Sequence, residues 1–152
     1  MKHQIIIYVH FRETDKPGTT RNDGARCEDI TNLTFGDNSV DLIVSSDVLE
    51  HVPDFHAAVE ESARVLVKGG WHIFTVPTTG NTVQRAKLVD GNVKHLTAPE
   101  YHSDPLNSDG ILAFWTFGFD LPQLFSSEGV RILQMAGPDG NNGRVVWGMQ
   151  KL

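Results

Sequence analysis

The stretch of residues 40–76 limits the possible folds more than any other part of the sequence. Residues 40–44 are apolar almost throughout, which is typical of a strand that is covered on both faces. A helix is expected over residues 54–67, because Asp54 can cap its first turn. Apolar side chains then recur at helical spacing: Phe55, Val59, Ala63 and Leu66. Gly69 and Gly70 are expected to end this helix.

This helix lies between two expected strands and predicts a βαβ unit. Val40–Ser46 and residues 71–76 are expected to be parallel neighbours in the centre of a sheet, joined by a right-handed crossover. Other strands are expected at residues 4–9, 25–30, 82–89, 92–96, 111–116, 130–135 and 145–149, with a short helix at 120–125. The fold class is therefore α/β, with residues 1–152 in a single domain.

Asp90 and Gly91 are the strongest short hairpin signal in the chain. We expect a β-hairpin around them. Residues 12–24 and 98–110 are polar and contain glycine and proline, which predicts loops. The hairpin and the second loop belong to an expected insertion at about residues 78–118.

The composition indicates a globular protein, with 39% hydrophobic and 21% charged residues. The net charge is −6 without a basic stripe, which argues against nucleic acid as a partner. No apolar run is long enough to span a membrane. Cys27 is the sole cysteine, so no internal disulfide can form, which suits the reducing cytoplasm. We expect a cytoplasmic protein that acts on a small molecule.

Polar residues follow two of the expected strands, at residues 28–29 and 46–51. Open parallel sheets bind ligands at the carboxyl ends of their strands, so both clusters are candidate sites. Asp29 can accept a hydrogen bond from an adenine amino group while the Ile30 amide meets a ring nitrogen. The alternative is that Asp29 only forms a turn.

The second cluster is denser and holds Asp47, Glu50 and His51. These side chains can point the same way if the loop begins to coil helically. Two carboxylates and an imidazole suit proton transfer or a divalent cation. The alternative is that the acids cap backbone amides and His51 packs beneath the helix. The remaining histidines match no zinc spacing, so we expect no metal site built from them: His3, His10, His56, His72, His95 and His102.

Residues 27–77 resemble class I S-adenosylmethionine-dependent methyltransferases of the type 11 kind. The matching pieces are the acidic strand end before LTF, the block VDLIVSSDVLEHV, and RVLVKGG before a strand. Residues 95–121 are similar to a subgroup of bacterial methyltransferases with an insertion after the fifth strand. The resemblance implies a Rossmann-like, mostly parallel sheet with flanking helices. It also implies methyl transfer to a small-molecule acceptor.

The same resemblance implies roles for individual residues. Asp29 and Ile30 fall where the family holds adenine, and Ser46 and Asp47 fall beside the methionine end of the cofactor, S-adenosylmethionine. Glu50 is expected to be catalytic.

His51 is the second expected catalytic residue. Asp47, Glu50 and His51 are also similar to the acid-x-x-Glu-His cluster of ubiquinone-biosynthesis O-methyltransferases, which binds magnesium. A hard cation could orient and acidify a hydroxyl there. We nevertheless expect no metal ligands in this chain, because many relatives carry the same residues without a metal.

The chain departs from the family at its start. Class I methyltransferases open the cofactor site with a strand and a glycine-rich turn, and this sequence holds no such turn. We therefore expect an N-terminally truncated sheet. Residues 4–9 are expected to lie parallel beside Val40–Ser46, or a second copy of the chain covers that edge in a homodimer. Residues 12–24 would then crowd the methionine half of the pocket and weaken cofactor binding beyond about 100 μM.

Two other functions are compatible with the sequence. The first is a non-catalytic, methyltransferase-like module that acts as a dimer or a partner subunit. The second is a metal-dependent hydrolase that uses Asp47, Glu50 and His51.

Overall fold

The computed structural model describes residues 9–10, 15–104, 107–125, 129–137 and 144–152. Four of its strands form a sheet in the order β11 (Val130–Ala136), β12 (Arg144–Lys151), β4 (Leu66–Pro77) and β3 (Val40–Ser46). β3 and β4 are parallel, whereas β4–β12 and β11–β12 are antiparallel. The α/β class is confirmed. The expected mostly parallel arrangement is not found among the described pairs of this sheet, of which only β3–β4 is parallel.

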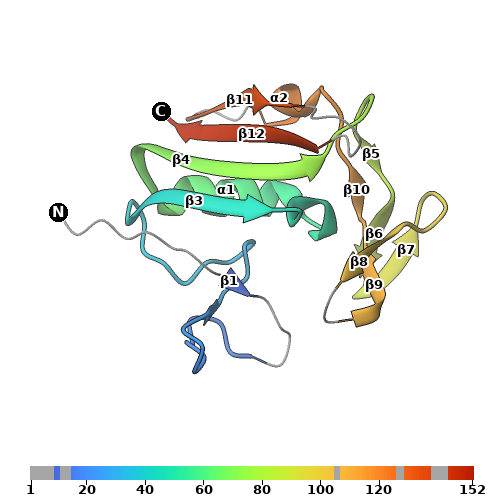
Figure 1. Cartoon of the computed structure of the whole chain (residues 1–152), viewed down its shortest axis with the longest axis horizontal. Coiled ribbons are helices and arrows are strands. Elements are labelled where there is room, and N and C mark those ends of the chain that lie inside the picture. The colour runs from blue at the N-terminus through green and yellow to red at the C-terminus, as the bar shows by residue number, and fades with distance from the viewer. Residues whose placement is uncertain (1–8, 11–14, 105–106, 126–128, 138–143) are drawn as a thin grey trace.

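Helix α1 (Phe55–Val65) connects β3 to β4 and covers one face of the sheet (Figure 1). The Asp54 carboxylate accepts a hydrogen bond of 3.1 Å from the Ala57 amide, as expected for the cap. The buried face of α1 packs on the core side chains of the sheet and of the following segments: Val40, Phe74, Val76, Phe117, Leu121, Phe125, Val145 and Trp147. The predicted βαβ unit is therefore confirmed.

Gly69 and Gly70 do not end α1, contrary to the expectation. The helix stops at Val65, and Leu66 is already extended and pairs with Val40. A Cβ atom on Gly70 would lie 2.9 Å from the Val67 carbonyl oxygen and 3.0 Å from that of Asp41. Gly70 serves a close approach of β4 to β3, where the register shifts, rather than a helix stop. Gly69 has open space around it and a φ of 79°.

The outer edge of β3 carries no strand partner within the described residues. Residues 4–8 of the expected neighbouring strand lie outside the described residues. Val9 belongs to β1 (Val9–His10), which pairs in parallel with β2 (Arg26–Cys27) and not with β3. The proposed cover for the β3 edge thus stays a prediction.

The segment between β4 and β11 folds into short antiparallel pairs beyond the carboxyl ends of β3 and β4 (Figure 1). The expected hairpin forms: β6 (Ala86–Val89) pairs with β7 (Asn92–His95), and Asp90 and Gly91 have φ values of 49° and 76°. Such positive angles are those of a tight two-residue hairpin turn. Its status as an insertion stays a prediction.

A second hairpin replaces the loop expected at residues 98–110. It consists of β8 (Tyr101–Asp104) and β9 (Asn107–Leu112). Backbone pairing forms these strands, and their described side chains are mostly exposed, so no hydrophobic alternation marks them. We call the residues from 78 to 118 the hairpin region.

Short elements complete the chain. β5 (Val83–Gln84) pairs with β10 (Trp115–Thr116), η1 (Leu49–His51) follows β3, and α2 (Leu121–Leu124) precedes β11. The strands expected at residues 130–135 and 145–149 and the short helix after Asp120 are confirmed. Among the described residues, no helix has the length and apolar character needed to cross a membrane.

Candidate functional site

The carboxyl end of β3 is a tight, polar turn. Asp47 has φ of 52°, which is uncommon for a residue other than glycine. Its amide donates to the Thr75 carbonyl oxygen at 2.9 Å, and the hydroxyls of Ser46 and Thr75 are 2.9 Å apart. The Arg144 Nε atom lies 3.2 and 3.1 Å from the two carboxylate oxygens of Asp47. Asp47 is thus held between β4 and β12.

Glu50 lies one turn further on, in η1, and is buried with 1% of its surface exposed. Its backbone carbonyl accepts a hydrogen bond of 2.8 Å from the Phe114 amide, so the hairpin region covers it. Neither carboxylate oxygen has a hydrogen-bond partner within the described residues. The pKa of Glu50 is raised to about 7, mainly by burial and also by the nearby Asp47 charge, whereas its own backbone amide and Arg144 act to lower it.

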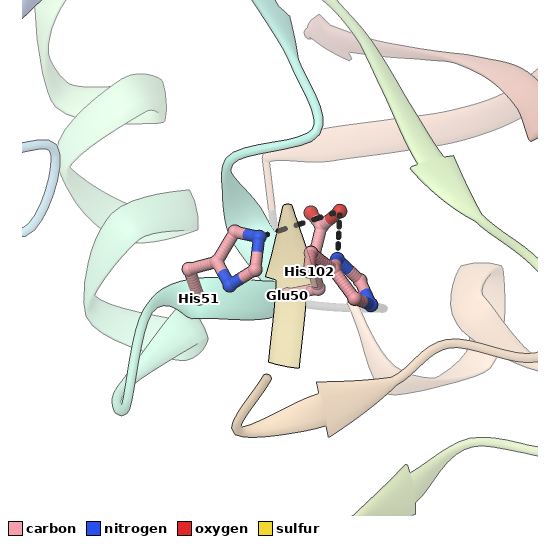
Figure 2. Close-up of side chains that lie close together, drawn as sticks. All are labelled: Glu50, His51 and His102. Carbon is pink, nitrogen blue, oxygen red and sulfur yellow. Dashed lines mark ion pairs between the residues drawn. The ribbon is translucent and has the colours of Figure 1, made fainter. Parts of the chain in front are cut away.

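Two histidines flank the Glu50 carboxylate (Figure 2). The His51 Nε2 atom is 4.0 Å and the His102 Nδ1 atom 3.7 Å from Glu50 Oε1. The two imidazole rings meet edge to face, with centroids 4.8 Å apart. We call these three residues the Glu50–His51–His102 cluster. Their ligand atoms all lie within 4.8 Å of one another.

The outward nitrogen of each imidazole faces an oxygen acceptor. His51 Nδ1 lies 2.9 Å from the Leu112 carbonyl oxygen, and His102 Nε2 lies 3.4 Å from Glu100 Oε1. Glu100 is itself held by Arg85, whose Nη2 atom lies 2.6 Å from Oε2. These contacts favour the tautomers whose lone-pair nitrogens face Glu50.

The structure brings together only part of the predicted cluster. Glu50 and His51 are neighbours as expected, whereas Asp47 is engaged by Arg144 and is not among the clustered ligand atoms. His102 takes its place, and sequence spacing gave no signal for it. It arrives from β8, in a segment that was expected to be a loop.

Asp29 forms a local turn. Its Oδ1 atom accepts hydrogen bonds from the Thr31 amide at 2.8 Å and from the Thr31 hydroxyl at 2.7 Å. Ile30 is partly buried against the core. The assignment of Asp29 and Ile30 to adenine stays a prediction, as does that of Ser46 and Asp47 to the methionine end.

Glu28 lies beside Asp29 and is also buried, with 1% of its surface exposed. Its carboxylate accepts hydrogen bonds from Arg26 and from the amide and hydroxyl of Thr34. Burial alone would raise its pKa, but the hydrogen bonds from Arg26 and Thr34 outweigh burial and lower the pKa.

His72 is another buried titratable group, and it lies in β4 next to Ser45. Its Nε2 atom is 2.9 Å from the Ser45 hydroxyl. Burial lowers the pKa of His72 to about 4, so the ring is neutral at neutral pH.

The comparisons with known proteins point to one kind of domain. Residues 11–74 match the family model described as a methyltransferase domain, of type 11. A search among curated proteins finds no match. Solved structures do match over most of the chain.

Three solved structures illustrate the likeness. A chain from the complex of the Trm112 methyltransferase activator with a methyltransferase of Haloferax volcanii has a TM-score of 0.54 at 17% identity, over 88% of this chain and 64% of that one. An S-adenosylmethionine-dependent methyltransferase from Listeria monocytogenes has a TM-score of 0.56 at 14% identity, over 88% and 72%. The 1,6-didemethyltoxoflavin-N1-methyltransferase of Burkholderia thailandensis, with bound 1,6-didemethyltoxoflavin and S-adenosylhomocysteine, has a TM-score of 0.52 at 14% identity, over 86% and 52%.

The chain thus spans between about half and three quarters of the length of these proteins. The matches confirm the Rossmann-like α/β fold class and the resemblance from which the cofactor was expected. At these identities, the likeness to solved structures concerns the fold.

Proposed function

Because this chain has the class I S-adenosylmethionine-dependent methyltransferase fold, we propose that it transfers a methyl group from S-adenosylmethionine to a small-molecule acceptor. The observation that carries the proposal is the position of Glu50 and His51, directly after the carboxyl end of the parallel strand β3. Ligands of such sheets bind at this edge. The acceptor itself stays unidentified.

The residues at the β3 exit fit the methionine end of this cofactor. That end carries an ammonium and a carboxylate group, and the Asp47–Arg144 pair offers one charge of each sign. At the other end, Thr31 engages only the Oδ1 atom of Asp29 among the hydrogen bonds of the described residues. Oδ2 is then the acceptor for the adenine amino group.

The bound cofactor would supply an electrophilic methyl group on a sulfonium. The residues of this chain would place the acceptor's nucleophilic atom in line with that methyl group, and catalysis is then mostly positioning. The new bond joins the acceptor to the methyl carbon, and the methyl–sulfur bond breaks with its electron pair on sulfur. We assign the acceptor's proton to Glu50 or His51, which lie side by side at this edge.

Calorimetric titration with S-adenosylhomocysteine tests the proposal. We expect measurable binding with a Kd weaker than about 100 μM, because these 152 residues hold no glycine-rich turn to approach the cofactor closely. Absence of binding at millimolar ligand would overturn the methyltransferase proposal. Low-micromolar binding would instead overturn the proposed impairment.

Asp29→Ala tests the adenine position in the same titration. It should weaken binding about tenfold or more, the effect of one lost hydrogen bond to a charged group. Glu60→Ala removes the same charge from an exposed position on α1 and should leave the affinity unchanged. Equal affinity of both variants would contradict the placement of adenine.

A non-catalytic module is the second candidate. It is favoured by the outer edge of β3, which has no strand partner within the described residues and exposes 62% of Val44. The Haloferax volcanii neighbour was solved in a complex with an activator protein, and a partner chain or a second copy on β3 would be the counterpart here. Loss of cofactor binding together with dimerisation in analytical ultracentrifugation would favour this candidate.

A further inference from the structure

We propose that Glu50, His51 and His102 form a binding site for one divalent first-row transition-metal ion, with Zn²⁺ as the reference ion. The proposal is independent of the methyl-transfer function. It departs from the expectation of no metal ligands. It also differs from the magnesium-binding cluster that the sequence resembles, since Asp47 has no part in it and His102 does.

The first argument is the convergence of ligand atoms. Glu50 Oε1 lies 3.7 Å from His102 Nδ1 and 4.0 Å from His51 Nε2. Three ligands at the usual Zn²⁺ distances in a tetrahedral site are ~3.4 Å apart. The two carboxylate–imidazole distances are thus about 0.3 and 0.6 Å longer than in such a site. The two imidazole nitrogens lie within 4.8 Å of each other, so a rotation of the rings has to bring them closer around an ion. Figure 2 shows the carboxylate between the two rings, with one nitrogen of each ring turned towards it.

The second argument concerns the opposite nitrogen of each ring. Metal-binding histidines usually donate this N–H to a carbonyl or a carboxylate, which fixes the lone pair on the metal-binding nitrogen. His51 Nδ1 faces the Leu112 carbonyl oxygen at 2.9 Å, and His102 Nε2 faces Glu100 at 3.4 Å. Arg85 in turn holds Glu100. Both imidazoles are thus oriented as ligands.

The third argument is the buried carboxylate. Glu50 is buried, with 1% of its surface exposed. Neither of its carboxylate oxygens has a hydrogen-bond partner within the described residues. A buried ionised carboxylate without a partner is costly, and natural proteins rarely keep one. With the histidines in the tautomers above, three acceptor atoms face one another. A cation between them would supply the partner that the Glu50 carboxylate lacks among the described residues.

The donor set selects the kind of ion. Mg²⁺ prefers oxygen ligands and an octahedral shell rich in water, whereas two imidazoles and one carboxylate suit zinc and its neighbours in the first transition row. Three protein ligands also leave a coordination position for water or a ligand. For an acceptor with a hydroxyl group, the ion would hold the reacting oxygen and lower its pKa. Glu50 and His51 would then act through the ion.

The test uses the untagged full chain after treatment with a chelator. Titration with Zn²⁺ should show one ion per chain, and Co²⁺ should give the visible absorption of an ion with mixed nitrogen and oxygen ligands. A thermal shift that grows with Zn²⁺ concentration should accompany binding. Mg²⁺ at the same concentration should produce neither signal, and equal binding of Mg²⁺ would overturn the assignment to transition metals.

Two substitutions separate this site from adventitious binding. His102→Gln should weaken Zn²⁺ binding at least 100-fold, whereas His95→Gln, at an exposed histidine in the neighbouring hairpin, should have no effect. Glu100→Gln should weaken binding by about tenfold, because it supports His102 without touching the ion. Circular dichroism verifies that each variant is folded. Equal Zn²⁺ affinity of the His102 and His95 variants, or no stoichiometric binding by the parent chain, would overturn the proposal.

Discussion

Two glutamates are equally buried but differ in their hydrogen-bond partners and in the direction in which their pKa is shifted. Glu28 and Glu50 each expose 1% of their surface. Glu28 is surrounded by donors, from Arg26 and Thr34, and its pKa is lowered. Glu50 meets no donor within the described residues, and burial raises its pKa to about 7. The first carboxylate stabilises a loop, whereas the second costs free energy that only a bound partner returns.

The origin of the donors explains the difference. Arg26 and Thr34 lie two and six residues from Glu28, so the partners come from the same short segment. Of the two imidazoles beside the Glu50 carboxylate, His51 is the next residue, whereas His102 comes from β8, far along the chain. A locally paired acid is a structural element, whereas a buried acid that lacks a hydrogen-bond partner among the described residues and faces a side chain from a distant segment indicates a site.

The largest expected effect is that of removing the charge from Glu28. Glu28→Gln should lower the free energy of unfolding by about 2–3 kcal/mol, because charge-assisted hydrogen bonds from Arg26 and Thr34 are lost. Urea denaturation at pH 7 measures it. A change below about 0.5 kcal/mol would remove the contrast with Glu50.

His72 tests what burial does when no charged partner is present. Its folded pKa, about 4, lies below the ordinary value of 6.5, so the unfolded state binds more protons between these pH values. The stabilising effect of the neutral ring is complete above about pH 6.5 and is lost as the pH falls towards 4. Relative to His72→Gln, the parent chain should lose about 2 kcal/mol between pH 8 and pH 5. A constant difference between the two chains over this range would show that the pKa of His72 is the same in the folded and unfolded states.

Thr34 sharpens the description of the paired acid. Thr34→Val removes the hydroxyl that donates to Glu28 but keeps the backbone amide. The free energy of unfolding should fall by about 1 kcal/mol, as for one hydrogen bond. Thr97→Val, at an exposed threonine, serves as the control and should change it by less than about 0.5 kcal/mol. An equal effect of both substitutions would show that the Thr34 hydroxyl contributes nothing measurable to the pairing of Glu28.

The smallest effect, and one of opposite sign, is expected for Glu50→Gln in the metal-free chain. At pH 8 it should leave the free energy of unfolding unchanged or raise it by up to about 1 kcal/mol, because an unpaired buried charge disappears. Chemical denaturation in the presence of a chelator measures it. A loss comparable to that of Glu28→Gln would mean that Glu50 is a structural acid as well.

The part of the fold that the sequence predicted depends on local patterns. The apolar run of β3, the capped stripe of α1 and the turn at Asp90 and Gly91 each act within a few neighbouring residues. The end of α1 was predicted wrongly because Gly70 is required by a tertiary contact, the close approach of β4 to β3, and not by the end of the helix. A local sequence pattern does not reveal a contact between residues that are far apart in the chain.

For the same reason, the sequence predicted Glu50 and His51 as site residues but not His102. Glu50 and His51 are adjacent in sequence, so locating the end of β3 was enough to predict that they lie together. To predict His102, the sequence would have had to reveal a hairpin of polar strands and the docking of this region against η1 through the Phe114 amide. Neither the polar hairpin nor its docking produces a periodic hydrophobic pattern in the sequence.

The docking of the hairpin region also sets the order in which the molecule can assemble. The Phe114 amide bonds to Glu50, and the Trp115 indole donates to the carbonyl oxygens of Val52 and Pro53 at 3.1 and 3.2 Å. Each contact closes a chain loop of some sixty residues, whereas β3, α1 and β4 are consecutive. Long loops close late because their entropy cost precedes any gain. By this argument we expect Glu50 to stay hydrated while the βαβ unit forms and to lose its hydration only when the hairpins dock with His102.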